Sequence, residues 1–281
     1  MVLKTVRLAR RPWRVYQSGD AGPPEDWGAI ARIYDLEHPA CRGAELAFWH
    51  QMATETGGPV LELAAGSGRI AIALARKGHH VTGLELAAGM LARARARTAR
   101  LPPAVAGRLQ WVQGDMARFT IPWAQFRLVF VAYNSFWLLT DLRAQRRCLD
   151  CVRRHLAPGG RLVLDVFPPN DDDYQDERGI IQLVAAPWRG RHLVRVKDYT
   201  YNPRRQLAIS DVRYYTAGPQ AGQPGRLLAT FRYCLRLATP QEMQALLEQA
   251  GYRIEATYGT YRRDPLAPDT PRAIFVAGVG P

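Results

Sequence analysis

Hydrophobic residues follow two different periods along this chain, and the period changes near residue 168. Before that point, short apolar runs alternate with segments in which apolar residues recur at helical spacing. The runs predict strands at 59–65, 79–86, 108–115, 126–134 and 161–167. Helices are predicted between them at 67–78, 88–100 and 142–156, and a turn at 158–160 is predicted to end the last of these helices. Strands that alternate with helices of this length are joined by right-handed crossovers, so the pattern predicts a parallel sheet.

An antiparallel segment is predicted after Phe167. The acidic stretch 168–179 has the composition of a loop, and four runs with two-residue alternation follow it. These runs are 180–187, 191–201, 206–217 and 226–237. Thr239 then suits a helix cap and Pro240 the first helical position, and two further strands at 252–259 and 272–279 follow that helix. The predicted fold class is α/β: a Rossmann-like, mostly parallel sheet flanked by helices, with an antiparallel β insert after strand five.

The composition fits a folded protein with one core, or with a core and an appended subdomain. The chain has 281 residues, of which 47% are hydrophobic and 22% charged. No window approaches the roughly 18 consecutive apolar residues that a membrane span needs. Residues 1–20 carry positive charge but lack the apolar centre of a signal peptide. These features predict a cytoplasmic protein without a membrane segment.

The chain is strongly basic, with 38 Lys and Arg against 25 Asp and Glu and a formal net charge of +13. Such a balance is compatible with nucleic-acid binding. The basic residues are nearly all arginine, however, and they are spread along the whole chain rather than gathered in one block. The charge alone therefore does not predict a nucleic-acid partner.

Cys148 and Cys151 form a C-x-x-C pair inside the predicted helix 142–156. Positions three apart share one face of a helix. A zinc ribbon needs a second ligand pair near suitable turns, and the sequence offers none. We therefore expect no metal here and predict that the two thiols are buried as small apolar groups.

The residues that could bind a ligand lie at the ends of the predicted strands, where an open α/β sheet binds its ligands. The first strand ends in a turn containing Gly66 and Gly68, which permits sharp bends and close approach of a ligand to the backbone. Glu85 ends the second strand, where a carboxylate can accept hydrogen bonds from both hydroxyls of a ribose. Asp115 ends the third strand, where it can accept one from the amino group of an adenine.

Part of this pattern also fits a dinucleotide-binding motif. Gly66-x-Gly68-x-x-Ala71 matches G-x-G-x-x-A, and Glu85 lies nineteen positions after Gly66. Glu62, inside the end of the first strand, has no counterpart in that motif. Asp115, at the end of the third strand, also argues against a dinucleotide site.

Taken together, these segments resemble the class I S-adenosylmethionine-dependent methyltransferases, in particular members that act on small molecules. The similar segments are 60–95 for the first two motifs, 109–116 for the third, 128–135 for the fourth, 155–167 for the fifth, and 239–259 near the C-terminus. The motifs occur in order and at the family's spacing. One position departs from the pattern, because Ala64 stands where the family commonly has its first glycine.

The resemblance implies S-adenosylmethionine as cofactor and assigns roles by position. Gly66 and Gly68 would line the methionine moiety, Glu85 would hold the ribose, and Asp115 the adenine amine. Met90 would pack on the adenine face, although a helix core residue is an equal alternative. The full set of candidate cofactor residues is Glu62, Ala64, Gly66, Gly68, Arg69, Glu85, Leu86, Met90, Gly114, Asp115, Met116, Tyr133 and Tyr34.

The acceptor is expected at the end of the fourth strand, in the run from Tyr133 to Trp137. This run lacks the Pro-Pro-aromatic motif of amino-methylating DNA enzymes, and no Pro-Cys nucleophile indicates a 5-methylcytosine enzyme. A neutral amine acceptor needs little beyond placement, whereas an alcohol or phenol needs a base. The candidate substrate-binding residues are Trp27, Asn134, Trp137 and Tyr233. No catalytic residue is assigned.

The leading hypothesis is N- or O-methylation of a small-molecule acceptor. An RNA or protein methyltransferase is an alternative that the basic charge supports and the missing target motifs oppose. Two further alternatives are a nicotinamide-dependent oxidoreductase and a cofactor-binding protein without catalytic activity. Asp115 and the antiparallel C-terminal segment argue against the oxidoreductase.

Four segments are predicted. Residues 1–58 form an N-terminal arm and cap helices at 27–38 and 40–55, and residues 59–169 form the cofactor-binding core. Residues 170–238 form the β insert, a lid or a surface for a homodimer, and residues 239–281 complete the core. The partner expected is a small-molecule substrate; neither nucleic acid nor a membrane is expected.

Overall fold

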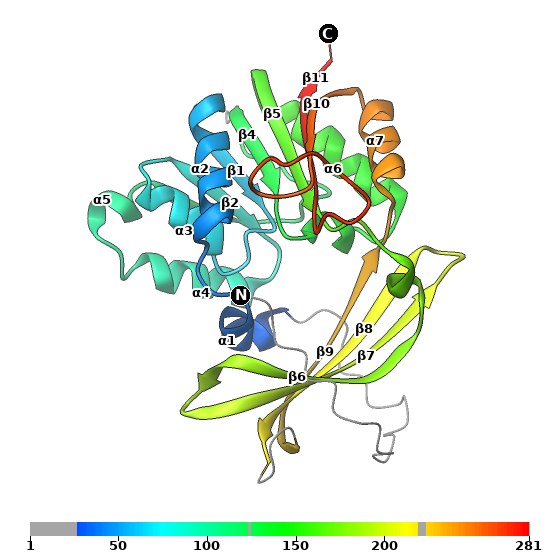
Figure 1. The fold of residues 1–281 in the computed structure, drawn as a ribbon. Coiled ribbons are helices and arrows are strands. Elements are labelled where there is room, and N and C mark those ends of the chain that lie inside the picture. Colours follow the sequence, from blue (N-terminus) through cyan, green and yellow to red (C-terminus); the bar gives the residue numbers. More distant parts are fainter. Residues whose placement is uncertain (1–26, 123–124, 219–222, 281) are drawn as a thin grey trace. The chain divides into compact units, whose positions relative to one another are not determined.

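The computed structural model describes residues 27–122, 125–218 and 223–280 (Figure 1). The chain divides into two compact units. Among the described residues, the core unit comprises those within 40–170 and 236–280, and the insert unit those within 27–39 and 171–235. The helix at 27–37 therefore belongs to the insert unit, and the helix at 43–56 belongs to the core unit.

The core unit contains a seven-stranded sheet with the order β10-β11-β5-β4-β1-β2-β3. Its strands are β1 (Val60–Leu63), β2 (Val81–Glu85), β3 (Leu109–Gln113), β4 (Phe126–Val131), β5 (Leu156–Val166), β10 (Tyr252–Tyr258) and β11 (Ala273–Val279). β1 to β5 pair in parallel, and β11 runs antiparallel to both β5 and β10. The predicted mostly parallel sheet is confirmed.

The helices of the core unit are α2 (Gly43–Thr56), α3 (Arg69–Arg76), α4 (Ala88–Thr98), α5 (Pro103–Ala106), α6 (Leu142–His155) and α7 (Pro240–Gln249), with a 3-10 turn η1 at Ser135–Leu138. α7 begins with the capping box between Thr239 and Glu242, and Pro240 occupies its first position. The main hydrophobic core joins Phe48, Trp49 and Met52 of α2 to the buried strands.

β5 differs from the sequence prediction, which placed a turn at 158–160 between helix and strand. The strand already begins at Leu156, and the extra residues form a bulge against β4, where the partner of Phe126 is Leu156 but the partner of Leu128 is Arg161. Gly159 has φ 70° there, and a Cβ at Gly160 would lie 2.9 Å from the carbonyl oxygen of Ala157. The glycines therefore permit a bulge rather than a chain reversal. α5 and η1 were not predicted.

The insert unit contains α1 (Trp27–Glu37), a 3-10 turn η2 (Asp171–Tyr174) and an antiparallel sheet in the order β6-β7-β8-β9. Its strands are β6 (Glu177–Trp188), β7 (Arg191–Asn202), β8 (Leu207–Ala217) and β9 (Pro224–Arg236). Ile30 and Ile33 of α1 pack with Tyr214 and Phe231 of the sheet. The predicted antiparallel insert after β5 is confirmed.

Cys148 and Cys151 are buried on α6, and both thiols are free. Within the described part of the chain, no group of three or more His, Cys, Asp or Glu side chains is placed to hold a metal ion. The described helices include none long and apolar enough to cross a membrane.

Candidate active site

A turn of unusual backbone conformation joins β1 to α3. Ala64, Gly66 and Gly68 all have positive φ, with values of 53°, 57° and 78°. The left-handed region costs a residue with a side chain roughly 1–2 kcal/mol, which glycine avoids. Ala64, the position that departs from the family pattern, therefore adopts the conformation that glycine prefers. We call residues 64–68 the glycine loop.

Glu85, at the end of β2, is bound to the glycine loop. Its Oε2 accepts the backbone N–H of Gly66 at 2.7 Å, and its Oε1 accepts that of Ala87 at 2.8 Å. Burial raises the pKa of this carboxyl, and the backbone N–H groups of Ala87, Gly66 and Leu86 oppose the shift. A carboxylate offers about four lone-pair sites, so the group can fix the loop and still accept a hydrogen bond from a ligand, as the predicted ribose contact requires.

Glu62 lies inside β1 and is only 4% exposed. Its Oε2 accepts the backbone N–H of Ala71 in the first turn of α3 at 2.9 Å. Burial raises the pKa of Glu62 to about 8, and the nearby Arg69 acts in the opposite direction. In this structure, the side chain ties the start of α3 to the strand beneath it.

The end of β3 continues the same edge of the sheet. Asp115 accepts the backbone N–H of Ala117 through Oδ1 at 2.8 Å, and its carboxylate is 3.3 Å from the guanidinium of Arg118. The side chain of Asp115 is 30% exposed, so its oxygens are accessible to a ligand. Of the other candidates near this edge, Met116 and Met90 are buried and Leu86 is exposed.

The end of β4 presents Tyr133 and Asn134, which both have positive φ, at 55° and 68°. Tyr133 is 42% exposed as a residue. The guanidinium carbons of Arg69 and Arg272 lie 5.3 Å and 5.6 Å from its centroid, within the range of cation–π contacts. Burial raises the pKa of the Tyr133 phenol. The phenol therefore stays protonated at neutral pH.

A buried carboxylate that the sequence analysis missed holds this turn in place. Asp165 of β5 has no exposed surface, and it accepts the backbone N–H of Tyr133 at 2.9 Å and the hydroxyl of Tyr261 at 2.8 Å. The guanidinium of Arg272 donates to its other oxygen at 2.6 Å. The side-chain oxygen of Asn134 accepts the backbone N–H of Phe167 at 2.8 Å. The ends of β4 and β5 are therefore joined by side chains as well as by the sheet.

Several predicted residues lie elsewhere or are otherwise engaged. Trp137 has no exposed surface and packs edge-on against Phe167 at 4.6 Å, so it is part of the core. Both terminal nitrogens of Arg69 donate to the carboxylate of Glu45 at 2.6 Å. The three predicted residues Trp27, Tyr34 and Tyr233 belong to the insert unit, where the Trp27 ring contacts the rings of the other two. Their proposed ligand contacts stay predictions.

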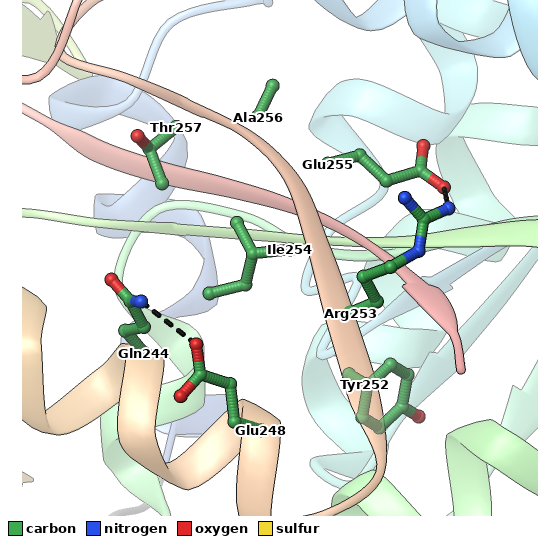
Figure 2. Close-up of a pocket in the computed structure, with 8 residues that line it drawn as sticks. All are labelled: Gln244, Glu248, Tyr252, Arg253, Ile254, Glu255, Ala256 and Thr257. Carbon is green, nitrogen blue, oxygen red and sulfur yellow. Dashed lines mark hydrogen bonds and ion pairs between the residues drawn. The ribbon is translucent and has the colours of Figure 1, made fainter. Parts of the chain in front are cut away.

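A cavity of about 520 Å³ opens at a different place in the core unit (Figure 2). Its lining residues come from α7 and from β10, namely Gln244, Glu248 and 252–257. β11 and β5 separate β10 from β4 in the sheet. The cavity contains none of the residues described above, and we assign it no role in the reaction.

Comparisons with known proteins identify the family of this chain. A methyltransferase-domain model matches residues 60–160. The dTDP-3-amino-3,6-dideoxy-alpha-D-glucopyranose N,N-dimethyltransferase of Streptomyces fradiae is 30% identical over 217 residues, which cover 74% of this chain and 78% of that protein. The putative methyltransferase YqeM of Bacillus subtilis is 32% identical, and the match spans 53% of this chain and 62% of its length.

Two solved structures show the same fold. The CcbJ methyltransferase of Streptomyces caelestis has a TM-score of 0.77 at 24% identity, covering 91% of this chain and 98% of that one. The second structure is SAM-bound CalS10, an amino pentose methyltransferase from Micromonospora echinaspora involved in calicheamicin biosynthesis. It has a TM-score of 0.64 at 26% identity, and the match covers 88% of this chain and 94% of CalS10.

The glycine loop, Glu85 at the end of β2, Asp115 after β3 and the antiparallel β11 are typical of α/β proteins that bind a nucleoside-containing cofactor. With the matches above, the chain belongs to the class I S-adenosylmethionine-dependent methyltransferase family. It is an S-adenosylmethionine-dependent methyltransferase, and its cofactor is S-adenosylmethionine.

Proposed function

We propose that this protein transfers a methyl group to the amino nitrogen of a small acceptor, and that amino sugars are the acceptor class. The observation that carries the proposal is the 30% identity to an amino-sugar N,N-dimethyltransferase over 78% of that protein. CalS10, whose acceptor is an amino pentose by its name, resembles 88% of this chain over 94% of its own length.

The residues at the strand ends fit the cofactor. S-adenosylmethionine supplies an activated methyl group on a sulfonium. We propose that Glu85 binds the ribose hydroxyls, Asp115 the adenine amine, and the glycine loop the methionine end. Support comes from Glu85, which bonds directly to the loop, and from Asp115, which is partly exposed on the same edge.

The end of β4 favours an amine over a hydroxyl acceptor. Its exposed side chain, Tyr133, is a phenol whose pKa is raised, so it serves as a hydrogen-bonding group rather than as a base. Asp165 is buried and occupied by its partners. His155 is also buried, and its Nε2 accepts the backbone N–H of Ile121 at 3.0 Å. A neutral amine needs only placement, which this arrangement can supply.

A matched pair of acceptors tests the proposal. The enzyme is given S-adenosylmethionine with either dTDP-3-amino-3,6-dideoxyglucose or dTDP-6-deoxyglucose, which has a hydroxyl in place of the amine. We expect mass increases of one or two methyl groups on the amino sugar alone. The rate should rise with pH toward the pKa of the amine, because only the neutral form is nucleophilic. Methylation of the hydroxyl compound, or of neither, would refute the amino-sugar proposal.

A further inference from the structure

The glycine loop is held from the side of α4 by Arg97, which lies outside the motif segment 60–95. Ser67, between the two loop glycines, is 1% exposed. Both its carbonyl oxygen and its hydroxyl accept hydrogen bonds from one nitrogen of Arg97, at 3.1 Å and 3.0 Å. Arg97 lies in the last turn of α4. The Arg97 guanidinium therefore fixes Ser67, the only residue of the loop with a polar side chain.

A second contact supports the loop from β3. A Cβ on Gly68 would lie 2.5 Å from the ring of Trp111, and a Cβ on Gly83 of β2 would lie 2.3 Å from it. The indole ring therefore fills the space that these two glycines leave. Its N–H donates to the hydroxyl of Thr98 at 3.0 Å, and that hydroxyl donates to the carbonyl of Ala94 at 2.9 Å. The position of Trp111 is thus fixed by α4 as well.

Two consecutive residues of α4 therefore support the same loop, Arg97 by binding Ser67 and Thr98 by holding Trp111 against Gly68. The loop needs such support because three of its five residues have positive φ and one of those three is an alanine. Alanine has a Cβ, so positive φ carries a steric cost for it that glycine does not have.

We propose that Arg97 and Thr98 are positioning residues for the methionine half of S-adenosylmethionine. They act through the glycine loop and do not touch the ligand. The nucleoside half depends instead on Asp115 and Glu85, and Glu85 itself hydrogen-bonds to Gly66 of the loop. The proposal rests on the cofactor and not on the acceptor, so a failure of the amino-sugar proposal leaves it standing.

The test compares two ligands that share the nucleoside but differ in the methionine part, S-adenosylhomocysteine and adenosine. In Arg97→Ala, we expect the dissociation constant of S-adenosylhomocysteine to rise about tenfold, in line with loss of a charge-assisted hydrogen bond. The dissociation constant of adenosine should rise less than about twofold. The matched control is Arg95→Ala, which removes an exposed arginine from the same helix and should change neither value. Titration calorimetry and NMR competition provide the constants, and thermal melts confirm that each variant is folded.

A second pair of variants addresses Thr98 and keeps the proposal testable if Arg97→Ala fails to fold. Thr98→Ser keeps the hydroxyl that binds Trp111 and should preserve S-adenosylhomocysteine affinity. Thr98→Val keeps the shape, loses the hydroxyl, and should weaken S-adenosylhomocysteine more than adenosine. A purely structural role would lower the melting temperature and weaken both ligands alike. Equal losses for the two ligands, or equal behaviour of Arg95→Ala and Arg97→Ala, would overturn the proposal.

Discussion

Ala64 stands where the family commonly has a glycine, and its positive φ predicts a measurable effect on stability. Its φ of 53° lies where a side chain is disfavoured, whereas Gly66, at 57°, has open space around a would-be Cβ. We predict that Ala64→Gly raises the free energy of unfolding by up to about 1 kcal/mol, since relief of strain exceeds the added chain entropy. Gly66→Ala should lower it by about 1 kcal/mol. Urea denaturation measures both, and a destabilised Ala64→Gly would show that the conformation is not strained.

Glu85 and Asp115 differ in how firmly the structure holds them, and the difference predicts unequal effects on cofactor affinity. Glu85 is buried and organises the loop, while Asp115 is partly exposed. We expect Glu85→Ala to raise the dissociation constant of S-adenosylhomocysteine at least about tenfold, because a bidentate charged contact is worth roughly 1.5–3 kcal/mol. Asp115→Ala should cost less. Calorimetry decides, and wild-type affinity in Glu85→Ala would refute the ribose assignment.

Glu62 predicts a dependence of stability on pH. Burial raises its pKa from 4.5 to about 8, so the folded protein holds this proton more tightly than the unfolded chain. The stability contributed by the protonated form is complete below pH 4.5 and is lost as the pH rises toward 8. Glu62→Gln cannot ionise. We therefore expect the variant to gain stability relative to wild type by more than about 1 kcal/mol between pH 5 and pH 8. A difference that does not vary with pH would contradict the raised pKa.

At the scale of elements, Asp165 links β4, β5 and the segment between β10 and β11. Removing one partner of a buried ion pair costs about 3–5 kcal/mol, because the other charge stays buried without compensation. Asp165→Asn should therefore lower the free energy of unfolding strongly. Arg272→Gln should lower the free energy of unfolding much less in the Asp165→Asn background than in the wild-type protein, because no charge of the pair then stays buried alone. Chemical denaturation of the two single variants and the double variant measures the coupling, and strictly additive losses would contradict the network.

The elements that carried a clear local signal were predictable. Periodic apolar runs located the strands and long helices, and Thr239 with Pro240 located the start of α7. Gly159 and Gly160 were misinterpreted as a turn because glycine permits both a turn and a bulge, and only the pairing of β5 with β4 decides between them. The short α5 and η1 offered too few residues for a periodic pattern.

The candidate site was predictable only in part, for a related reason. Gly66, Glu85 and Asp115 lie at or just after the ends of strands, so their positions along the chain indicate a shared edge. Asp165 and Arg272 are 107 residues apart, and nothing local distinguishes that aspartate within its strand. Trp137, predicted to bind substrate, is wholly buried, because aromatic residues at strand ends serve the core as readily as a ligand.

At the scale of the whole molecule, the net charge of +13 will attract polyanions at low salt whatever the acceptor is. Binding to RNA is therefore not evidence of RNA methylation. Some arginines are paired within the core unit, such as Arg69 with Glu45 and Arg272 with Asp165, and others within the insert unit, such as Arg232 with Asp211.

The central claim, that the methyl group goes to the amine of a small molecule, is tested most directly by one competition assay. The enzyme receives methyl-labelled S-adenosylmethionine together with amino-sugar nucleotides, simple amines, phenols, carboxylic acids, total RNA and DNA at physiological salt. Mass spectrometry then locates the label. We predict that it lies on the nitrogen of an amino sugar, with none in the nucleic acids. Label at a defined base of RNA, and in none of the small acceptors, would contradict the account.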